Sequence, residues 1–228
     1  MIIQIYTAQS EAEARSLADL GVDHIGLTVA ERGLPGEIDL ATGRDIVAVL
    51  EGVATSIALT VDTDPMAVRM LAATLEPDIL HLCGDTRLFP PSAVADLREW
   101  LEKRRMPVAL LQAIPVTGPE AVVEARRFAR HVDWLLLDSV TDQVEGIGAA
   151  GMTHDWSISR RIVEESDVPV ILAGGLGPDN VAEAIAAVQP AGVDSLTRTN
   201  RALAGGGFEK DLAAVAHFIS AARSVGGR

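Results

Sequence analysis

Three side chains in this sequence could carry acid–base chemistry: Asp138, His81 and Cys83. Asp138 follows the apolar run 134–137 and precedes a long polar loop. A carboxyl group at the end of a buried strand is partly desolvated, which raises its pKa and makes it usable as a general acid. The alternative is that Asp138 only caps the next turn, a common role for aspartate after a strand.

His81 and Cys83 stand two residues apart in an apolar run, so strand periodicity puts both on one face. If that face lines the active site, the imidazole and the thiol could serve as base, nucleophile or metal ligands. The alternative for Cys83 is the role of a small buried hydrophobic residue. His154 and Asp155 close the loop after Asp138. We expect Asp155 to cap the next helix and His154 to contact substrate.

A phosphate site is predicted where two loops meet. Gly174, Gly175 and Gly177 lie between an apolar run and the next helix, and glycines there let backbone N–H groups approach an anion. The loop after the following apolar run adds two hydroxyls and a guanidinium, those of Ser195, Thr197 and Arg198. A phosphate site between the seventh and eighth loops recurs in (β/α)8 barrels.

These residues can form one site only if the strands that precede them all end at the same face of the protein. Short apolar runs alternate with amphipathic runs eight times along the 228 residues. The predicted strands are Ile2–Tyr6, Asp23–Val29, Ala54–Val61, Asp78–Cys83, Pro107–Ile114, Val132–Asp138, Val168–Ala173 and Gly192–Leu196. The predicted helices are Ser10–Leu20, Asp39–Leu50, Asp64–Leu75, Ser92–Arg104, Pro119–Arg130, Asp155–Glu165, Pro178–Val188 and Glu209–Ser224.

Nearly continuous apolar strands are typical of parallel strands covered on both faces. Eight strand–helix units predict an α/β protein, a single (β/α)8 TIM barrel formed by residues 1–228, with its active site at the C-terminal ends of the strands. The rival is an open doubly wound sheet. It is disfavoured because no Gly-x-Gly-x-x-Gly motif follows the first strand.

The composition of the chain favours small molecules as its binding partners over nucleic acids and membranes. A formal net charge of −13 and 4 % aromatic residues disfavour nucleic acid and anionic membranes. A phosphorylated ligand would therefore need local donors. One cysteine excludes an internal disulfide, no metal or cofactor motif is present, and no signal peptide or membrane span is expected. We expect a cytoplasmic monomer or homodimer.

Four segments resemble phosphoribosylanthranilate isomerase, and the resemblance runs nearly end to end. They are Leu80–Asp85, Leu135–Ser139, Gly148–Trp156 and Leu172–Val181. Members of that family open the ring of a phosphoribosyl amine and move a proton to give a ketose. They use an aspartate acid after the sixth strand and a cysteine base after the first. The resemblance implies that Asp138 is the acid.

Three positions depart from the family pattern. Tyr6 stands where the base cysteine is expected, and a tyrosine with an ordinary pKa near 10 is a poor base. Arg32 is only a loose substitute for the anchor of the anthranilate carboxylate. Leu196-Thr197-Arg198 replaces a Ser-Ser-Gly segment at the phosphate site, so Arg198 is expected to supply charge there.

These departures favour an aldose–ketose type isomerase or epimerase acting on a small, phosphorylated sugar-like substrate. Asp138 would be the acid, and His81 or Cys83 would replace the base lost at Tyr6. Three alternatives stay open: genuine phosphoribosylanthranilate isomerase with a relocated base, a non-catalytic phosphosugar-binding barrel, and a metal-dependent lyase or hydrolase. The metal-dependent enzyme would use His81, Cys83, His154 and Asp138.

Overall fold

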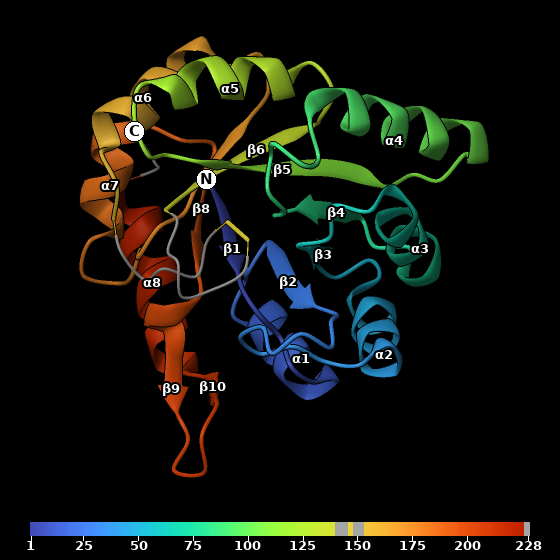
Figure 1. Cartoon of the computed structure of the whole chain (residues 1–228). Coiled ribbons are helices and arrows are strands. Elements are labelled where there is room, and N and C mark those ends of the chain that lie inside the picture. The colour runs from blue at the N-terminus through green and yellow to red at the C-terminus, as the bar shows by residue number, and fades with distance from the viewer. Residues whose placement is uncertain (140–145, 148–152, 226–228) are drawn as a thin grey trace.

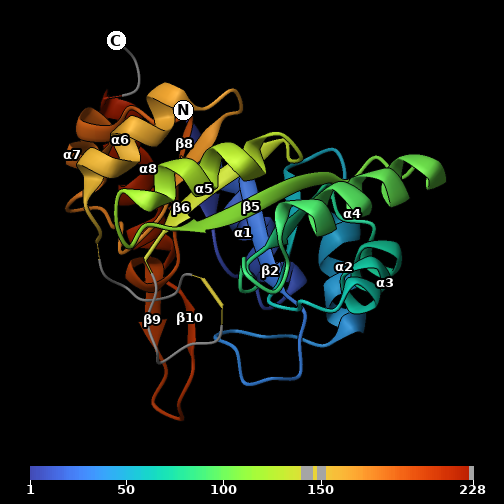
Figure 2. The same ribbon diagram turned by 45° about the horizontal axis from the view of Figure 1, so that its top comes forward.

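Eight parallel strands close into a barrel with helices around it, which confirms the predicted (β/α)8 architecture (Figure 1, Figure 2). The computed structural model describes residues 1–139, 146–147 and 153–225. Each strand pairs with its neighbour in the chain, and β8 pairs with β1 to close the sheet.

The barrel strands are β1 (Ile2–Ile5), β2 (His24–Thr28), β3 (Thr55–Thr60), β4 (Ile79–Leu82), β5 (Ala109–Pro115), β6 (Trp134–Asp138), β7 (Val170–Leu172) and β8 (Gly192–Ser195). The helices are α1 (Glu11–Asp19), α2 (Leu40–Leu50), α3 (Pro65–Leu75), α4 (Pro91–Arg104), α5 (Glu120–Ala129), α6 (Trp156–Glu165), α7 (Val181–Val188) and α8 (Leu212–Val225).

Helix starts follow from local hydrogen bonding. The side chains of Ser10, Asp39, Asp64 and Asp155 each accept a hydrogen bond from a backbone N–H in the first turn of the helix that follows. Such caps satisfy donors that have no partner inside the helix. Asp155 therefore has the capping role predicted for it. Pro65 occupies the first turn of α3, where its missing N–H costs nothing.

The strands have apolar side chains on both faces, and these form two cores. One core lies between the strands and the helices and includes Ile3, Leu80 and Val193. The other fills the barrel interior and includes Leu111, Leu136, Ile171 and Ala173, together with Tyr6 and Cys83 near the mouth. A filled interior leaves only the C-terminal mouth of the barrel for chemistry.

A short hairpin after β8 is the main element that the sequence did not predict. The 3-10 turn η1 (Thr197–Thr199) leads into β9 (Asn200–Ala202), which pairs antiparallel with β10 (Phe208–Lys210). Figures 1 and 2 show this hairpin projecting from the barrel beside α8. Glu209 therefore lies in a strand, and the last helix begins at Leu212 instead of Glu209. The turn uses Gly206 and Gly207 at φ of 92° and 75°, values that favour glycine.

The seventh helix also starts later than predicted, at Val181 instead of Pro178. Its preceding residues form a turn in which the Gly177 N–H donates to the Asn180 Oδ1 at 2.8 Å. None of the helices in the described part of the chain has the length and apolar character needed to cross a membrane.

Candidate active site

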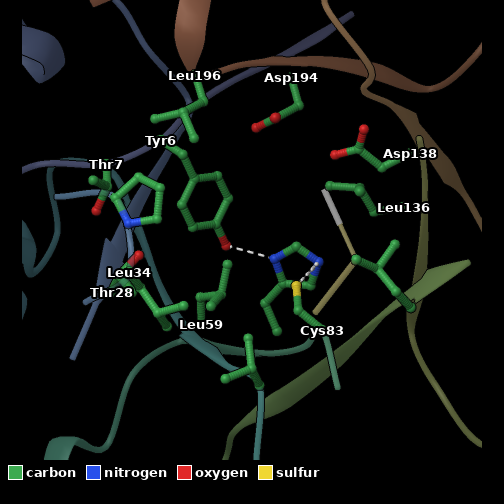
Figure 3. A pocket seen from close by; sticks show the side chains of 14 residues that line it. Tyr6, Thr7, Thr28, Leu34, Leu59, Cys83, Leu136, Asp138, Asp194 and Leu196 are labelled. Carbon is green, nitrogen blue, oxygen red and sulfur yellow. Dashed lines mark hydrogen bonds between the residues drawn. The ribbon is translucent and has the colours of Figure 1, made fainter. Parts of the chain in front are cut away.

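A cavity of about 70 Å³ lies at the C-terminal ends of the strands (Figure 3). Its wall includes Tyr6 after β1, His81 and Cys83 from β4 and its end, Asp138 from β6 and Asp194 from β8. The structure thus brings together all four predicted catalytic residues, and it adds Asp194. Thr28, Leu34, Leu59, Val61, Ile147 and Leu196 contribute much of the remaining surface.

Tyr6, His81 and Cys83 form a hydrogen-bonded chain across the cavity. The Tyr6 hydroxyl lies 2.7 Å from Nδ1 of His81, and the Cys83 Sγ lies 3.2 Å from Nε2 of the same ring. Figure 3 shows the Tyr6 ring reaching toward the middle of the cavity with its hydroxyl at the start of this chain. All three residues are at least 96 % buried.

Burial keeps each member of this chain neutral. Desolvation lowers the pKa of His81 to about 3 and raises the pKa values of Tyr6 and Cys83 well above their usual range. At neutral pH the imidazole is a weak base, and the phenol and the thiol hold their protons. The chain is therefore suited to positioning and hydrogen bonding, and it is poorly suited to the base role predicted for His81 or Cys83.

Two carboxyl groups face the cavity beside this neutral chain. Asp138 is 8 % exposed and Asp194 is 7 % exposed, and Figure 3 shows both at one side of the cavity. Desolvation, with the neighbouring Asp194 charge, raises the pKa of Asp138 to about 8; the Ser139 N–H, which donates to the Asp138 Oδ1 at 2.6 Å, opposes this rise. Desolvation also raises the pKa of Asp194 to about 7. The charge of Asp194 disfavours ionisation of Asp138, so the titrations of the two buried carboxyl groups are coupled.

Asp194 is the more readily ionised carboxyl of the pair because two neighbours lower its pKa against desolvation: the Gln4 side chain and, with a smaller effect, Lys210. The Lys210 Nζ donates to the Tyr6 carbonyl and to the Asn200 Oδ1, and the residue is 5 % exposed. Burial lowers the pKa of Lys210 itself to about 7, so its positive charge beside Asp194 is only partial near neutral pH. The unpredicted hairpin therefore matters to the site, because β10 delivers this lysine beneath the cavity.

A second, smaller cavity of about 20 Å³ adjoins the carboxyl pair on the β7 and β8 side. Four residues predicted to bind phosphate line it: Gly174, Gly175, Ser195 and Thr197. Gly174 and Gly175 have φ of 88° and 61°, and their N–H groups have no acceptor among the described residues. Adjacent unsatisfied N–H groups in such a conformation form an anion-binding concavity.

The other predicted binding residues do not line this pocket; they are Gly177, Arg198, His154 and Arg32. Arg198 packs on Gly177 and donates to both carboxylate oxygens of Asp179, at 3.0 and 2.8 Å. Its guanidinium therefore joins the two loops, whereas the prediction had it supply charge to phosphate. His154 packs behind Gly174, and its Nε2 lies 2.7 Å from the Ser159 Oγ.

Arg32 lies in a larger groove of about 830 Å³ at the ends of β3, β4 and β5. The groove shares Val61 and Ile147 with the central cavity, so the two spaces adjoin. Arg32 forms an ion pair with Asp62. Among the described residues, no three His, Cys, Asp or Glu side chains are grouped as metal ligands, so this part of the chain offers no support for the metal-dependent alternative.

Comparison with known proteins identifies the family. Residues 44–197, more than half of the chain, match the family model described as N-(5'-phosphoribosyl)anthranilate isomerase. The chain belongs to this family. An N-(5'-phosphoribosyl)anthranilate isomerase of Haloferax volcanii is 33 % identical over 226 residues, which cover 99 % of this chain and 94 % of the relative. An N-(5'-phosphoribosyl)anthranilate isomerase of Myxococcus xanthus is 32 % identical over 216 residues, which cover 94 % of this chain and 92 % of the relative.

Solved structures of the N-(5'-phosphoribosyl)anthranilate isomerase family share the fold. The Thermotoga maritima enzyme, a dimeric protein studied as engineered monomers, superposes with a TM-score of 0.76 at 21 % identity, covering 98 % of this chain and all of that one. Another solved member, at TM-score 0.76 and 20 % identity over the same coverage, is in complex with reduced 1-(o-carboxyphenylamino)-1-deoxyribulose 5-phosphate. The predicted resemblance is confirmed, and the relatives named here are isomerases.

Asp194 is a cavity-lining carboxyl that the sequence analysis did not single out. It lies in β8 with an interior-facing side chain, and our predicted phosphate loop began one residue later, at Ser195. The available signal was an acidic residue inside a short apolar strand, because a buried carboxyl is rarely tolerated without a partner or a function.

Proposed function

We propose that this protein is an aldose–ketose isomerase acting on a phosphorylated sugar derivative, with Asp138 as general acid and Asp194 as general base. The observation that carries the proposal is the buried carboxyl pair with pKa values of about 8 and about 7. Such a pair holds a proton on one member and a negative charge on the other near neutral pH, which is what proton transfer between adjacent carbons requires.

The phosphate of the substrate is assigned to the glycine-lined pocket. The N–H groups of Gly174 and Gly175, with the hydroxyl of Thr197, provide uncharged local donors. Local donors are needed because the chain carries a net charge of −13, which repels phosphate at long range. The pocket adjoins Asp138 and Asp194, both of which also line it.

The two carboxyls complete a balanced proton transfer. The Asp194 carboxylate takes the proton from C2, and the electron pair of that C–H bond forms a double bond to C1. Asp138 gives its proton to the heteroatom on C1 as the C1 double bond to that atom opens. The Asp138 carboxylate then takes the proton of the C2 hydroxyl while Asp194 returns its proton to C1. The product is a ketone, and both carboxyls regain their starting states.

We expect a narrow bell-shaped dependence of kcat/KM on pH. Activity needs ionised Asp194, so it should fall below about pH 7, and it needs protonated Asp138, so it should fall above about pH 8. Rates measured from pH 5 to pH 10 in buffers of constant ionic strength test this. A profile that stays flat across that range would show that this pair does not perform the proton transfer.

The second candidate is N-(5'-phosphoribosyl)anthranilate isomerase itself, which the names of relatives over 30 % identical favour. Expression of the chain in a tryptophan auxotroph that lacks this enzyme separates the two. Growth without tryptophan supports the second candidate. Failure to grow, together with turnover of another aldose phosphate by the purified protein, supports the first.

A further inference from the structure

The Tyr6 side chain is fixed between two strands of the barrel. Its ring lies against Gly26 of β2 so closely that a Cβ on that glycine would be 2.2 Å from two ring carbons. Its hydroxyl is held by His81 of β4 at 2.7 Å. Tyr6 is 4 % exposed, and Figure 3 shows its ring among Thr28, Leu34 and Leu59. The ring therefore occupies the β2 side of the barrel mouth and is held there by Gly26 and His81.

This arrangement leaves little space at the carboxyl pair. The central cavity measures about 70 Å³, whereas pockets that hold ligands of ordinary size measure roughly 300–1,000 Å³. The space beside Asp138 and Asp194 suits the reacting carbons of a sugar and their hydroxyls. A larger group attached to C1 would have to lie elsewhere.

The groove that adjoins the cavity offers more space, and its charge is unfavourable for an anion. Its described lining includes the carboxylates of Asp62, Asp64, Asp85 and Glu124 and the guanidiniums of Arg32 and Arg87. Each arginine forms an ion pair with an aspartate of the groove: Arg32 with Asp62, and Arg87 with Asp85 at 2.6 Å. A carboxylate entering this groove would meet more negative than positive charge, and burying like charges together is costly.

We infer that Tyr6 is a specificity-determining residue that restricts this protein to phosphorylated aldose–ketose pairs without an anionic aryl group on C1. The inference rests on the proposed function, which supplies the reaction and the phosphate site. Tyr6 acts by filling the β2 side of the barrel mouth with its own ring, which closes that space to an aryl group. The groove acts by disfavouring the carboxylate of such a ring.

Two ligands and two variants test this inference by calorimetry. The ligands are ribulose 5-phosphate and reduced 1-(o-carboxyphenylamino)-1-deoxyribulose 5-phosphate, which share the phosphate and the sugar carbons. The variants are Tyr6→Ala, which removes the ring, and Tyr6→Phe, which keeps the ring and removes the hydroxyl. Circular dichroism and thermal melts establish that each variant is folded.

We expect ribulose 5-phosphate to bind the wild-type protein at least about tenfold more tightly than the aryl compound does. Tyr6→Ala should tighten binding of the aryl compound by about tenfold or more, and Tyr6→Phe should leave it within about threefold of wild type. Equal binding of both ligands to wild type overturns the inference, even if Tyr6→Ala does not fold. Tight binding of the aryl compound to Tyr6→Phe also overturns it.

If the proposed function itself is wrong, the calorimetry gives a different result from the one expected if only the role of Tyr6 is wrong. If neither ligand binds wild type or either variant, the assignment of a phosphorylated sugar substrate is wrong, and the specificity inference falls with it. If both ligands bind wild type equally, the assignment of a phosphorylated sugar ligand stands, and only the role of Tyr6 is wrong.

Discussion

Replacement of Asp138 by asparagine is expected to reduce turnover by about 10²–10⁴-fold, the usual contribution of a general acid or base. Asparagine keeps the size of the side chain and the oxygen that accepts the Ser139 N–H, but it has no proton to give. The loss should appear in kcat, because proton donation occurs only in the reaction step. Turnover within about threefold of wild type would remove Asp138 from the mechanism.

The free energy of unfolding of the same variant is expected to rise relative to that of wild type as the pH increases. The Asp138 pKa is about 8 in the folded protein and near 3.8 when unfolded, so between these values the folded state holds a proton that the unfolded state has lost. Folding stability therefore falls with rising pH across this window. Asparagine does not titrate, so from pH 5 to pH 8 the variant should gain up to about 4 kcal/mol relative to wild type. Urea unfolding at both pH values measures this difference.

Unchanged relative stability would mean that Asp138 is ionised in the folded protein at low pH and is no general acid. Asp179→Asn is a suitable control, because that carboxyl is exposed and paired with Arg198. Its stability relative to wild type should vary little between pH 5 and pH 8, since a surface ion pair contributes little.

Replacement of Gly26 by alanine is expected to destabilise the fold by about 1–3 kcal/mol or more through overpacking. The new methyl group would sit 2.2 Å from Cδ1 and Cε1 of Tyr6. The ring is buried and its hydroxyl is bonded to His81, so it can make way for the methyl group only by giving up these contacts. Denaturant unfolding of Gly26→Ala measures the cost, with a fall in the midpoint as the expected result.

A double-mutant cycle tests whether the destabilisation caused by Gly26→Ala comes from the clash with Tyr6. Gly26→Ala should be far less harmful in a Tyr6→Ala background, since the clashing ring is then absent. Gly205→Ala is the matched control, because a Cβ there meets nothing within 4 Å, and its effect should stay within about 0.5 kcal/mol. Additive effects of the two changes at Gly26 and Tyr6 would contradict the close packing of the ring on β2.

The sequence was sufficient to predict the barrel, because the eight units follow from local patterns. Apolar runs and helix caps such as Ser10 and Asp155 depend only on neighbouring residues. The order of the loops then placed Asp138 and Gly174 at one face correctly. The hairpin after β8 was not predicted, because its strands of three residues are too short to show a period.

The site was harder to predict because its contacts cross the barrel. No sequence pattern shows that the Tyr6 hydroxyl meets His81 from a strand 75 residues away, or that Lys210 reaches the Tyr6 carbonyl. Burial at the barrel mouth, which no local pattern shows, keeps His81 and Cys83 neutral and makes them poorly suited to act as bases. Asp194 is therefore the base that we propose, an inference that residue types alone do not give.

Exchange of hydrogen with solvent is the most direct test of the carboxyl pair. The wild-type protein is incubated in D₂O with ketose 5-phosphates that either carry or lack an arylamine at C1, and the C1 proton signals are followed by NMR. We predict that wild type incorporates deuterium at C1 of at least one of these compounds and that Asp194→Asn does not. No incorporation by wild type, or equal rates in Asp194→Asn, would contradict aldose–ketose isomerisation by Asp138 and Asp194.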